Sequence, residues 1–284
     1  MTSPTRPLGS SGLDITTVGF GAWSGGAEAG EPVERLYFQR RGLARASHRE
    51  RSGISAGPRR CPIGPPAAVL QQWEHPMPSQ RNDLQHSAVV VIDMANDFVY
   101  SGGVIADAGG PDYQQRAQRL IAPLGRLLAA ARRAGVTVVY ATDAHTPGDS
   151  ELRKWPPHAM AGSWNAEIVP GLAPEPGDIV LGKQTYSPFL NPAFERTLAE
   201  RGLTRLYVTG LHTDCCARHT SGDAFQRGYD LVWVTDALQA FTDEAHQAGL
   251  EYFKTWYATD PTRQLRTVEE LVGEWTAVPE PAVA

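Results

Sequence analysis

Two adjacent cysteines, Cys215 and Cys216, stand out as candidate nucleophiles in this sequence. They lie in the segment VTGLHTDCCARHTSGDAF, whose pattern predicts a strand, a tight turn and a helix. The turn places Cys216 near the amino end of that helix, where unpaired N–H groups and the helix dipole favour a thiolate. This position suits a nucleophile. The alternative interpretation is a pair of small side chains that pack the helix against a sheet, and it is favoured for Cys215.

Two charged residues follow other predicted strands. Asp93 is the first polar residue after a buried apolar run, and partial desolvation by its apolar neighbours would raise its pKa and suit it to proton transfer. The alternative role for a carboxylate at a strand end is a helix cap or a turn, which fits Asp97 better. Lys183 follows another strand pattern, where it either stabilises developing negative charge or is a solvated loop cation.

A third group of polar residues lies in one loop rich in Gly and Pro. Asp143 and His145 are two residues apart, Glu151 follows six residues later, and His158 lies seven residues beyond Glu151. Two imidazoles and two carboxylates can converge on one divalent ion, and such mixed donors suit zinc, iron or manganese. The alternative is an ordinary surface loop, because such loops often contain Asp and His.

The elements that position these residues follow from the hydrophobic pattern. Continuous apolar runs predict strands buried on both faces, and these runs alternate with helical patterns. The predicted strands are Ala88–Asp93, Val136–Thr142, Asp178–Gly182, Arg205–Gly210 and Leu231–Asp236. The predicted helices are Tyr113–Ala134, Pro192–Arg201, Cys216–Arg227 and Asp243–Tyr257. This alternation indicates an α/β fold, a doubly wound parallel sheet with helices on both faces, whose ligands bind at the carboxyl ends of the strands.

The N-terminal part of the chain has a different composition. Residues 1–87 are predicted to be a mostly disordered extension, and residues 88–284 are predicted to form the folded domain. Residues 31–60 contain eight Arg against three Glu, so a basic interaction tail is the alternative. Residues 6–23 predict a short hairpin and resemble the beginning of aldo-keto reductases. Nothing downstream supplies such a reductase, so this segment is interpreted as a remnant.

Composition excludes several classes of protein. The 284 residues contain 26 Lys and Arg against 31 Asp and Glu, a net charge of −5, so nucleic acid is not an expected partner. No apolar run approaches the ~18 residues that a membrane-spanning helix needs, and no signal-peptide core is evident, so we expect a cytoplasmic protein without a membrane partner. The three cysteines cannot form a disulfide framework and are expected to be reduced.

Taken together, the motifs from about Ser87 to Tyr257 resemble the isochorismatase-like cysteine hydrolase superfamily, most closely its nicotinamidase branch. Asp93 matches the catalytic aspartate of the D-x-x-x-D-F motif, and Lys183 matches the catalytic lysine. Cys216 matches the nucleophile of G-x-x-T-D-x-C, with Cys215 at the variable position. The resemblance therefore implies nucleophilicity at Cys216 rather than at its neighbour.

The same resemblance supports the metal site. The nicotinamidase D-x-H and W-P-P-H motifs correspond to Asp143 with His145 and to Trp155 through His158, and some members place a Glu where this chain has Glu151. The implied cofactor is a divalent metal, zinc first, with iron or manganese as alternatives. Phe98 and Trp155 match the aromatic residues that sandwich the substrate ring. The residues after the last His differ from the common nicotinamidase pattern, which indicates a different pocket shape.

The implied activity is hydrolysis of a small carboxamide, nicotinamide-like, to acid and ammonia through a thioester. The backbone N–H groups of His212 and Cys216 would form the oxyanion hole beside a cis peptide at Leu211–His212. One alternative is a related hydrolase of a ureido acid or an antibiotic lactam. Another, of a different class, is a non-catalytic metal-binding or interaction protein. Family members often form homo-oligomers, so an oligomer is expected here.

Overall fold

The computed structural model describes residues 5–7, 14–16 and 84–277, which fall in two units, Met1–Arg59 and Arg60–Ala284. In the first unit, β1 (Thr5–Pro7) pairs antiparallel with β2 (Asp14–Thr16). These strands lie within or beside the segment predicted as a hairpin. The rest of that segment, and residues 17–83 for which disorder is predicted, lie outside the described residues.

The second unit is built on a parallel sheet with the strand order β5-β4-β3-β6-β7-β8. Parallel neighbours need long crossover connections, and the intervening helices provide them. The strands are β3 (Ser87–Ile92), β4 (Thr137–Asp143), β5 (Ile179–Lys183), β6 (Arg205–Leu211), β7 (Asp230–Gln239) and β8 (Leu265–Arg266). The predicted α/β class, a doubly wound parallel sheet with helices on both faces, is confirmed.

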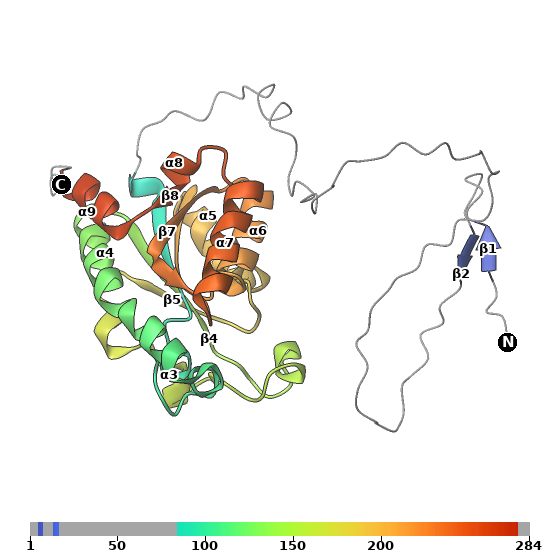
Figure 1. Cartoon of the computed structure of the whole chain (residues 1–284). Coiled ribbons are helices and arrows are strands. Elements are labelled where there is room, and N and C mark those ends of the chain that lie inside the picture. The colour runs from blue at the N-terminus through green and yellow to red at the C-terminus, as the bar shows by residue number, and fades with distance from the viewer. Residues whose placement is uncertain (1–4, 8–13, 17–83, 278–284) are drawn as a thin grey trace, which may run out of the picture. The chain divides into compact units, whose positions relative to one another are not determined.

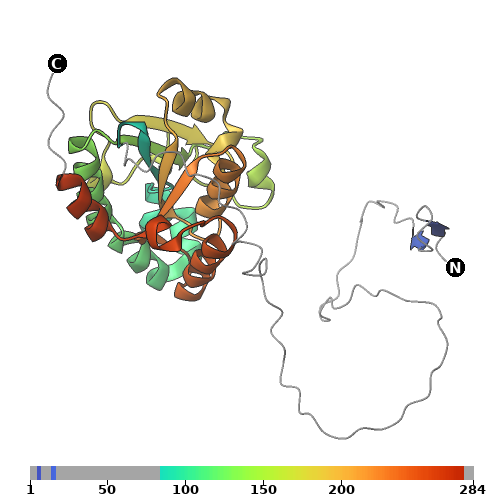
Figure 2. The ribbon, with the colours of Figure 1, turned by 90° about the horizontal axis from the view of Figure 1, so that it is seen from above.

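Helices cover both faces of the sheet because successive side chains of each strand point to opposite sides. In β3, Val89 and Val91 join one apolar core, while Val90 and Ile92 join the other. Figures 1 and 2 show the three layers that result. The first core is covered by α3 (Val104–Arg119), α4 (Ile121–Arg133) and α9 (Val268–Thr276), and the second by α5 (Pro192–Glu200), α6 (Cys216–Gln226) and α7 (Asp243–Trp256).

The helical region before β4 differs from the prediction. The sequence pattern predicts one helix over Tyr113–Ala134, whereas the structure has α3 and α4, separated at Leu120. Pro123 has no N–H to donate to the carbonyl of Arg119, so the helix cannot continue unbroken through this point. Four short elements are also absent from the sequence prediction: α2 (Asn96–Val99), α8 (Pro261–Gln264), β8 and α9.

The carboxyl ends of four strands meet at one edge of the sheet. Asp93 directly follows β3, and Asp143 and Lys183 end β4 and β5, where the two residues are register partners. The chain after β6 turns there into α6. Gly210 sits in this region with φ of 97°, and a Cβ at this position would overlap the backbone of Ile92. Only glycine allows β6 to approach β3 this closely.

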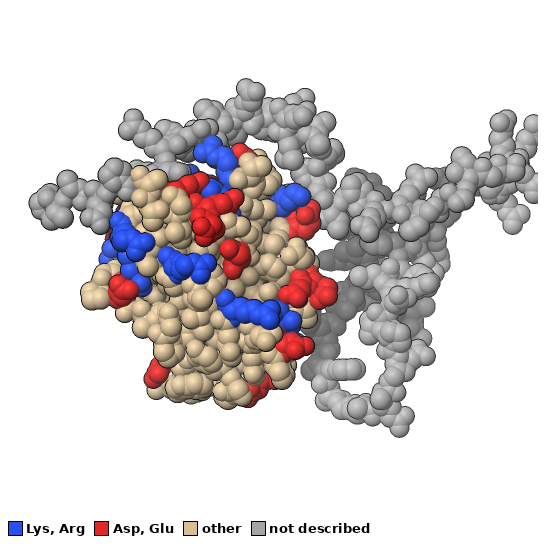
Figure 3. Space-filling view, turned by 60° about the vertical axis from the view of Figure 1, so that its left-hand side comes forward, with Lys and Arg blue, Asp and Glu red and all other residues tan. Residues whose placement is uncertain are grey.

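One face of the second unit carries charged side chains of both signs. Figure 3 shows the side on which α3, α4 and α9 lie, and there Lys and Arg side chains are interspersed with Asp and Glu. Surface pairs such as Arg266 with Glu274 and Arg132 with Glu175 are part of this mixture. Among the residues that the structure describes, no helix has the length and apolar character needed to cross a membrane.

Candidate active site

Four side chains form a buried cluster at the carboxyl edge of the sheet. Three of them lie at the ends of β3, β4 and β5, and the fourth begins α6. The Lys183 Nζ atom lies 2.8 Å from Oδ2 of Asp93 and donates to Oδ1 of Asp143 at 2.5 Å. The same Nζ lies 3.9 Å from Sγ of Cys216. The backbone N–H of Asp143 donates to Oδ1 of Asp93 at 2.9 Å. The structure therefore brings together the three residues that the sequence singles out for catalysis.

Burial sets the protonation of this cluster. Burial and the nearby charge of Asp143 raise the pKa of Asp93 to about 7, although Lys183 opposes the shift. Burial by itself would lower the pKa of Lys183, but Asp143 and Asp93 hold it well above its ordinary value. Lys183 is therefore an ammonium group, and Asp93 can both accept and return a proton near neutral pH.

Cys216 is the first residue of α6, as the sequence predicts, but its resting state differs from the expected thiolate. The hydrogen bond with Cys215 and complete burial raise the pKa of Cys216, and Lys183 only partly offsets this effect. The group at rest is thus a thiol that needs a base. Oδ2 of Asp93 is buried against the Lys183 ammonium, and the raised pKa of this carboxyl lets it take up the thiol proton.

The turn before α6 presents two unused backbone donors. Neither the N–H of His212 nor that of Cys216 donates to another group in the described part of the chain. The peptide bond between Leu211 and His212 is cis, as predicted from the resemblance. The carbonyl of His212 instead accepts from the N–H groups of Cys215 and Ala217 at 3.1 Å each. Two free N–H groups next to the Cys216 thiol suit a developing oxyanion.

Asp143, His145, Glu151 and His158 form a second cluster beside the first. One ligand atom from each residue lies within 4.8 Å of all the others. Oδ2 of Asp143 lies 3.6 Å from Nε2 of His145 and 3.6 Å from Nε2 of His158. A tetrahedral ion with bonds of about 2.1 Å separates its ligand atoms by about 3.4 Å. The spacing of these atoms therefore fits a metal ion.

The hydrogen bonds around the two imidazoles point to the same conclusion. Nδ1 of His145 contacts Asp149 at 3.3 Å, and Nδ1 of His158 donates to the carbonyl of Pro156 at 2.9 Å. Such outer contacts leave Nε2 of each ring directed at the cluster, as in metal-ligating histidines. Nε2 of His145 is buried and has no hydrogen bond to any residue that the structure describes, which is costly unless a ligand satisfies it.

A cavity of about 250 Å³ adjoins both clusters. Phe98 and Trp155, the two residues predicted to hold a substrate ring, line it together with Cys216. The indole N–H of Trp155 donates to the hydroxyl of Tyr186 at 3.0 Å, which links the metal-cluster loop to the segment after β5. Sequence reasoning did not find Tyr186 or Phe241, which also line this cavity, because neither belongs to a local motif.

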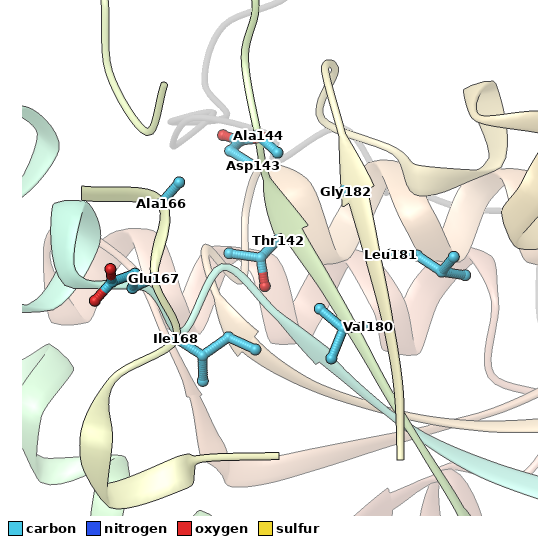
Figure 4. Close-up of a pocket in the computed structure, with 9 residues that line it drawn as sticks. All are labelled: Thr142, Asp143, Ala144, Ala166, Glu167, Ile168, Val180, Leu181 and Gly182. Atoms are coloured by element: carbon cyan, nitrogen blue, oxygen red, sulfur yellow. The ribbon is translucent and has the colours of Figure 1, made fainter. Parts of the chain in front are cut away.

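A second cavity of about 250 Å³ lies at the edge of the sheet (Figure 4). The residues that line it come from β4, from the edge strand β5 and from the segment 166–168. Figure 4 shows the carboxylate of Glu167 directed away from β5. The lining of this second cavity contains neither a cysteine nor a histidine. The cysteines and histidines of the described chain that could react therefore lie at the first cavity.

Asp97 has a structural role that the sequence underestimated. Its carboxylate accepts hydrogen bonds from the N–H groups of Ile105 and Ala159 at 2.9 and 2.6 Å and from the side chain of Asn165 at 2.8 Å. The sequence suggests a cap for Asp97, and its bond to Ile105 does satisfy an N–H group in the first turn of α3, although from outside that helix. Asp97 also holds the backbone next to His158 against α2 and α3.

Comparison with known proteins places this geometry in a family. A family model described as the Isochorismatase domain matches residues 87–264. The chain belongs to the isochorismatase family. The resemblance noted from the motifs is thereby confirmed, and the match covers the strands and loops that carry both clusters.

Relatives within this family are amide hydrolases. The chain is 33% identical over 233 residues to the ureidoacrylate amidohydrolase RutB of Variovorax paradoxus, covering 73% of this chain and 90% of that protein. The N-carbamoylsarcosine amidase of Thermoplasma acidophilum is 32% identical with a TM-score of 0.56, covering 64% of this chain and 96% of that one. The nicotinamidase PncA of Bacillus subtilis is 28% identical with a TM-score of 0.54, covering 64% and 99%. At the level these relatives share, the chain is an amidohydrolase of the isochorismatase family.

Proposed function

We propose that this protein hydrolyses a small, uncharged, nicotinamide-like carboxamide to the acid and ammonia, through a thioester on Cys216. The convergence of Asp93, Lys183 and Cys216 beside a cavity carries this proposal. A nucleophile, a proton carrier and a fixed positive charge within one buried cluster are the groups that acyl transfer from an amide requires.

Each step assigns one task to a group of this chain. Asp93 accepts the thiol proton of Cys216, and the sulfur forms a bond to the amide carbon. The N–H groups of His212 and Cys216 donate to the oxygen, which carries negative charge at this stage. The C–N bond then breaks, and Asp93 returns the proton to the departing ammonia. Water cleaves the thioester, which yields the acid and restores the thiol.

Lys183 keeps this cluster electrostatically balanced. Its ammonium contacts both Asp93 and Asp143, so two carboxylates can occupy one buried site without strong mutual repulsion. When Asp93 becomes protonated and Cys216 becomes a thiolate, the positive charge 3.9 Å from sulfur stabilises the new anion. Lys183 therefore favours the transfer without leaving its position.

Asp143, His145, Glu151 and His158 fit a divalent metal, with zinc first and iron or manganese as alternatives. A metal held there would supply a Lewis acid that binds and orients a donor atom of the substrate. Phe98 and Trp155 on the cavity wall provide flat apolar surfaces for an aromatic ring. The substrate ring would thus be held between them with its amide toward Cys216.

The charge of the cavity favours an uncharged substrate. Among the described residues that line it, Asp143, Glu151 and Asp214 are acidic, and none is Lys or Arg. Asp143 and Glu151 belong to the proposed metal site, so Asp214 is the acid that stays without a counterion on the cavity wall and disfavours a carboxylate-bearing substrate. This argument supports a neutral carboxamide over a ureido acid.

Ammonia release tests the proposal. Purified protein is incubated with nicotinamide, pyrazinamide, ureidoacrylate and an antibiotic lactam, before and after extraction with a strong chelator and after zinc is added back. We expect turnover of nicotinamide or pyrazinamide, loss of that turnover on extraction and recovery with zinc. Unchanged kinetics in metal-free protein would contradict the ligand assignment, and turnover of none of the four would contradict the proposed substrate class.

A second candidate is hydrolysis of a ureido acid. The similarity to ureidoacrylate amidohydrolase RutB over 73% of this chain favours it. The same panel separates the two candidates. Preference for ureidoacrylate would show that a cation outside the described cavity wall, or the metal itself, binds the carboxylate of the substrate.

A further inference from the structure

The proposed mechanism uses the backbone N–H group of His212 but gives no role to its imidazole side chain. The ring lines the active-site cavity and stacks on Phe241, with ring centroids 4.3 Å apart and an interplanar angle of 16°. Its Nε2 lies 2.7 Å from the hydroxyl of Tyr113. Tyr113 is itself fully buried and lies against both rings. The orientation of the imidazole is therefore fixed from two sides.

The buried hydroxyl of Tyr113 also determines the tautomer of this ring. Nε2 of His212 is the only hydrogen-bond partner of that hydroxyl within the described part of the chain. If Nε2 carried the proton, the O–H hydrogen of Tyr113 would remain buried without an acceptor, which costs about 1–3 kcal/mol. The arrangement that uses every buried donor has Tyr113 donating to Nε2. The ring proton of His212 is then on Nδ1.

The second ring nitrogen of His212, Nδ1, belongs to a side chain that lines the cavity. It makes no hydrogen bond to any described residue, and it is not among the fully buried polar atoms that lack a partner. An unpartnered atom that retains exposure, on a side chain that lines the cavity, is open to a ligand there. Burial and the charge of Lys183 lower the pKa of His212 to about 3, so the imidazole is uncharged near neutral pH.

We propose that the Nδ1–H group of His212, held in this tautomer by Tyr113, donates a hydrogen bond to a neutral acceptor on the part of the substrate outside the scissile amide. This inference rests on the proposed function, because it specifies which small carboxamides the cavity selects. A neutral imidazole N–H donates one hydrogen bond without bringing a positive charge, so it suits a ring nitrogen or a carbonyl oxygen better than it suits a carboxylate. The preferred substrates therefore carry a second, uncharged acceptor.

Selectivity between related amides tests this contact. For wild type and variants, kcat/KM is measured for benzamide, which has no ring acceptor, and for nicotinamide and pyrazinamide, which have one and two ring nitrogens. We expect His212→Phe, which keeps a flat ring on Phe241 without a donor, to lower the preference for at least one ring-nitrogen amide over benzamide about tenfold. His212→Asn, which keeps an N–H near the position of Nδ1, should retain most of that preference.

The ratio of kcat/KM for a ring-nitrogen amide to kcat/KM for benzamide is compared between wild type and variant. This ratio is unaffected by any loss of activity that is common to all three substrates. The metal-cluster residues are unchanged in each variant, so their contribution also cancels. Tyr113→Phe should weaken the preference as well, because the tautomer is no longer fixed, whereas Tyr229→Phe removes a phenol hydroxyl elsewhere and should not. Equal losses for all three amides in His212→Phe would overturn the inference.

A second measurement does not depend on turnover. Nitrogen-15 NMR of histidine-labelled protein distinguishes the two tautomers, and comparison with His212→Asn assigns the signals of His212. We expect the proton on Nδ1 and a shift of that signal on addition of pyrazinamide. A proton on Nε2, or an assigned Nδ1 signal that does not move at saturating amide, would overturn the inference. Failure of all three amides as substrates would contradict the proposed function, while the NMR result still decides the role of His212.

Discussion

At the scale of single residues, Asp143 connects the two clusters of the site. One carboxylate oxygen accepts from Lys183, and the other faces the imidazoles of His145 and His158. Burial alone would raise the pKa of Asp143, but Lys183 and the two imidazoles hold it well below its ordinary value. Asp143 is therefore an anion near neutral pH. Because it contacts both clusters, a change of charge in one of them alters the electrostatics of the other.

The first prediction concerns the two adjacent cysteines. Cys216→Ala should lower kcat by roughly 10³-fold or more, because it removes the sulfur that lies 3.9 Å from the Lys183 ammonium. Cys215→Ala should retain most of the activity, since Cys215 is half-buried and its sulfur has no described contact with Lys183, unlike that of Cys216. Ammonia release measures both variants, with circular dichroism as the control for folding. If Cys215→Ala were the inactive variant, the assignment of the nucleophile would be wrong.

The second prediction concerns pH. The pKa of Asp93 is raised from 3.8 to about 7, first by burial and then by Asp143, and the base must be deprotonated to accept the thiol proton. We expect kcat/KM to rise with pH and to level off above about 7. The folded protein also holds this proton more tightly than the unfolded chain, so the contribution of Asp93 to stability falls as pH rises from about 4 to about 7.

The pH profile of kcat/KM between pH 5 and 9 checks this prediction. Asp93→Asn removes the base and should leave little activity at any pH. A wild-type profile that is already level at pH 5 would indicate a carboxylate with an ordinary pKa and would contradict the role of Asp93.

At the scale of elements, the loop that carries His158 depends on α2 and α3. Asp97 belongs to α2 and accepts from Ile105 near the start of α3 and from Ala159 beside His158. Ala159 has φ of 38°, a left-handed conformation that a residue other than glycine adopts only when its surroundings hold it. One buried carboxylate thus fixes the backbone that presents His158, one of the proposed metal ligands.

The third prediction tests this contact. Asp97→Ala should lower the free energy of unfolding by roughly 2–4 kcal/mol, because buried N–H groups lose a charged acceptor, and it should weaken zinc binding. Asp107→Ala is the matched control. Asp107 is exposed and accepts from Gly102 at the surface, so its removal should cost less than about 1 kcal/mol. Urea unfolding and zinc titration measure both effects. Normal zinc affinity in Asp97→Ala would contradict the positioning role.

At the scale of the whole molecule, the two apolar cores and both clusters come from one part of the chain. The core residues extend from Leu84 to Trp275, and the family match covers residues 87–264. The homo-oligomer expected from the resemblance stays a prediction.

The fourth prediction follows from this distribution. We propose that the N-terminal segment is dispensable for folding and catalysis, so a chain that begins at residue 84 should keep kcat/KM within about threefold and unfold in one cooperative transition. Ammonia release and thermal unfolding, compared with the full-length protein, measure the effect. A large loss of activity with an intact unfolding transition would show that the segment takes part in the site.

The sequence by itself determined the strands, most of the helices and the side chains at the strand ends. These depend on local periodicity: buried runs such as Ala88–Asp93 have no other explanation, and parallel strands necessarily bring their carboxyl ends to one edge. The types of Asp93, Lys183 and Cys216, together with the motif spacing, were sufficient to name the cluster that the structure brings together.

Only the tertiary structure decided which groups touch and in what state. Tyr113 and His212 are 99 residues apart, and no local pattern indicates that they meet. The protonation of Cys216 and the partners of Asp97 likewise depend on burial and on segments distant in the chain. Periodicity encodes which face of an element is buried, but the identity of the neighbour on that face is fixed by packing the elements together.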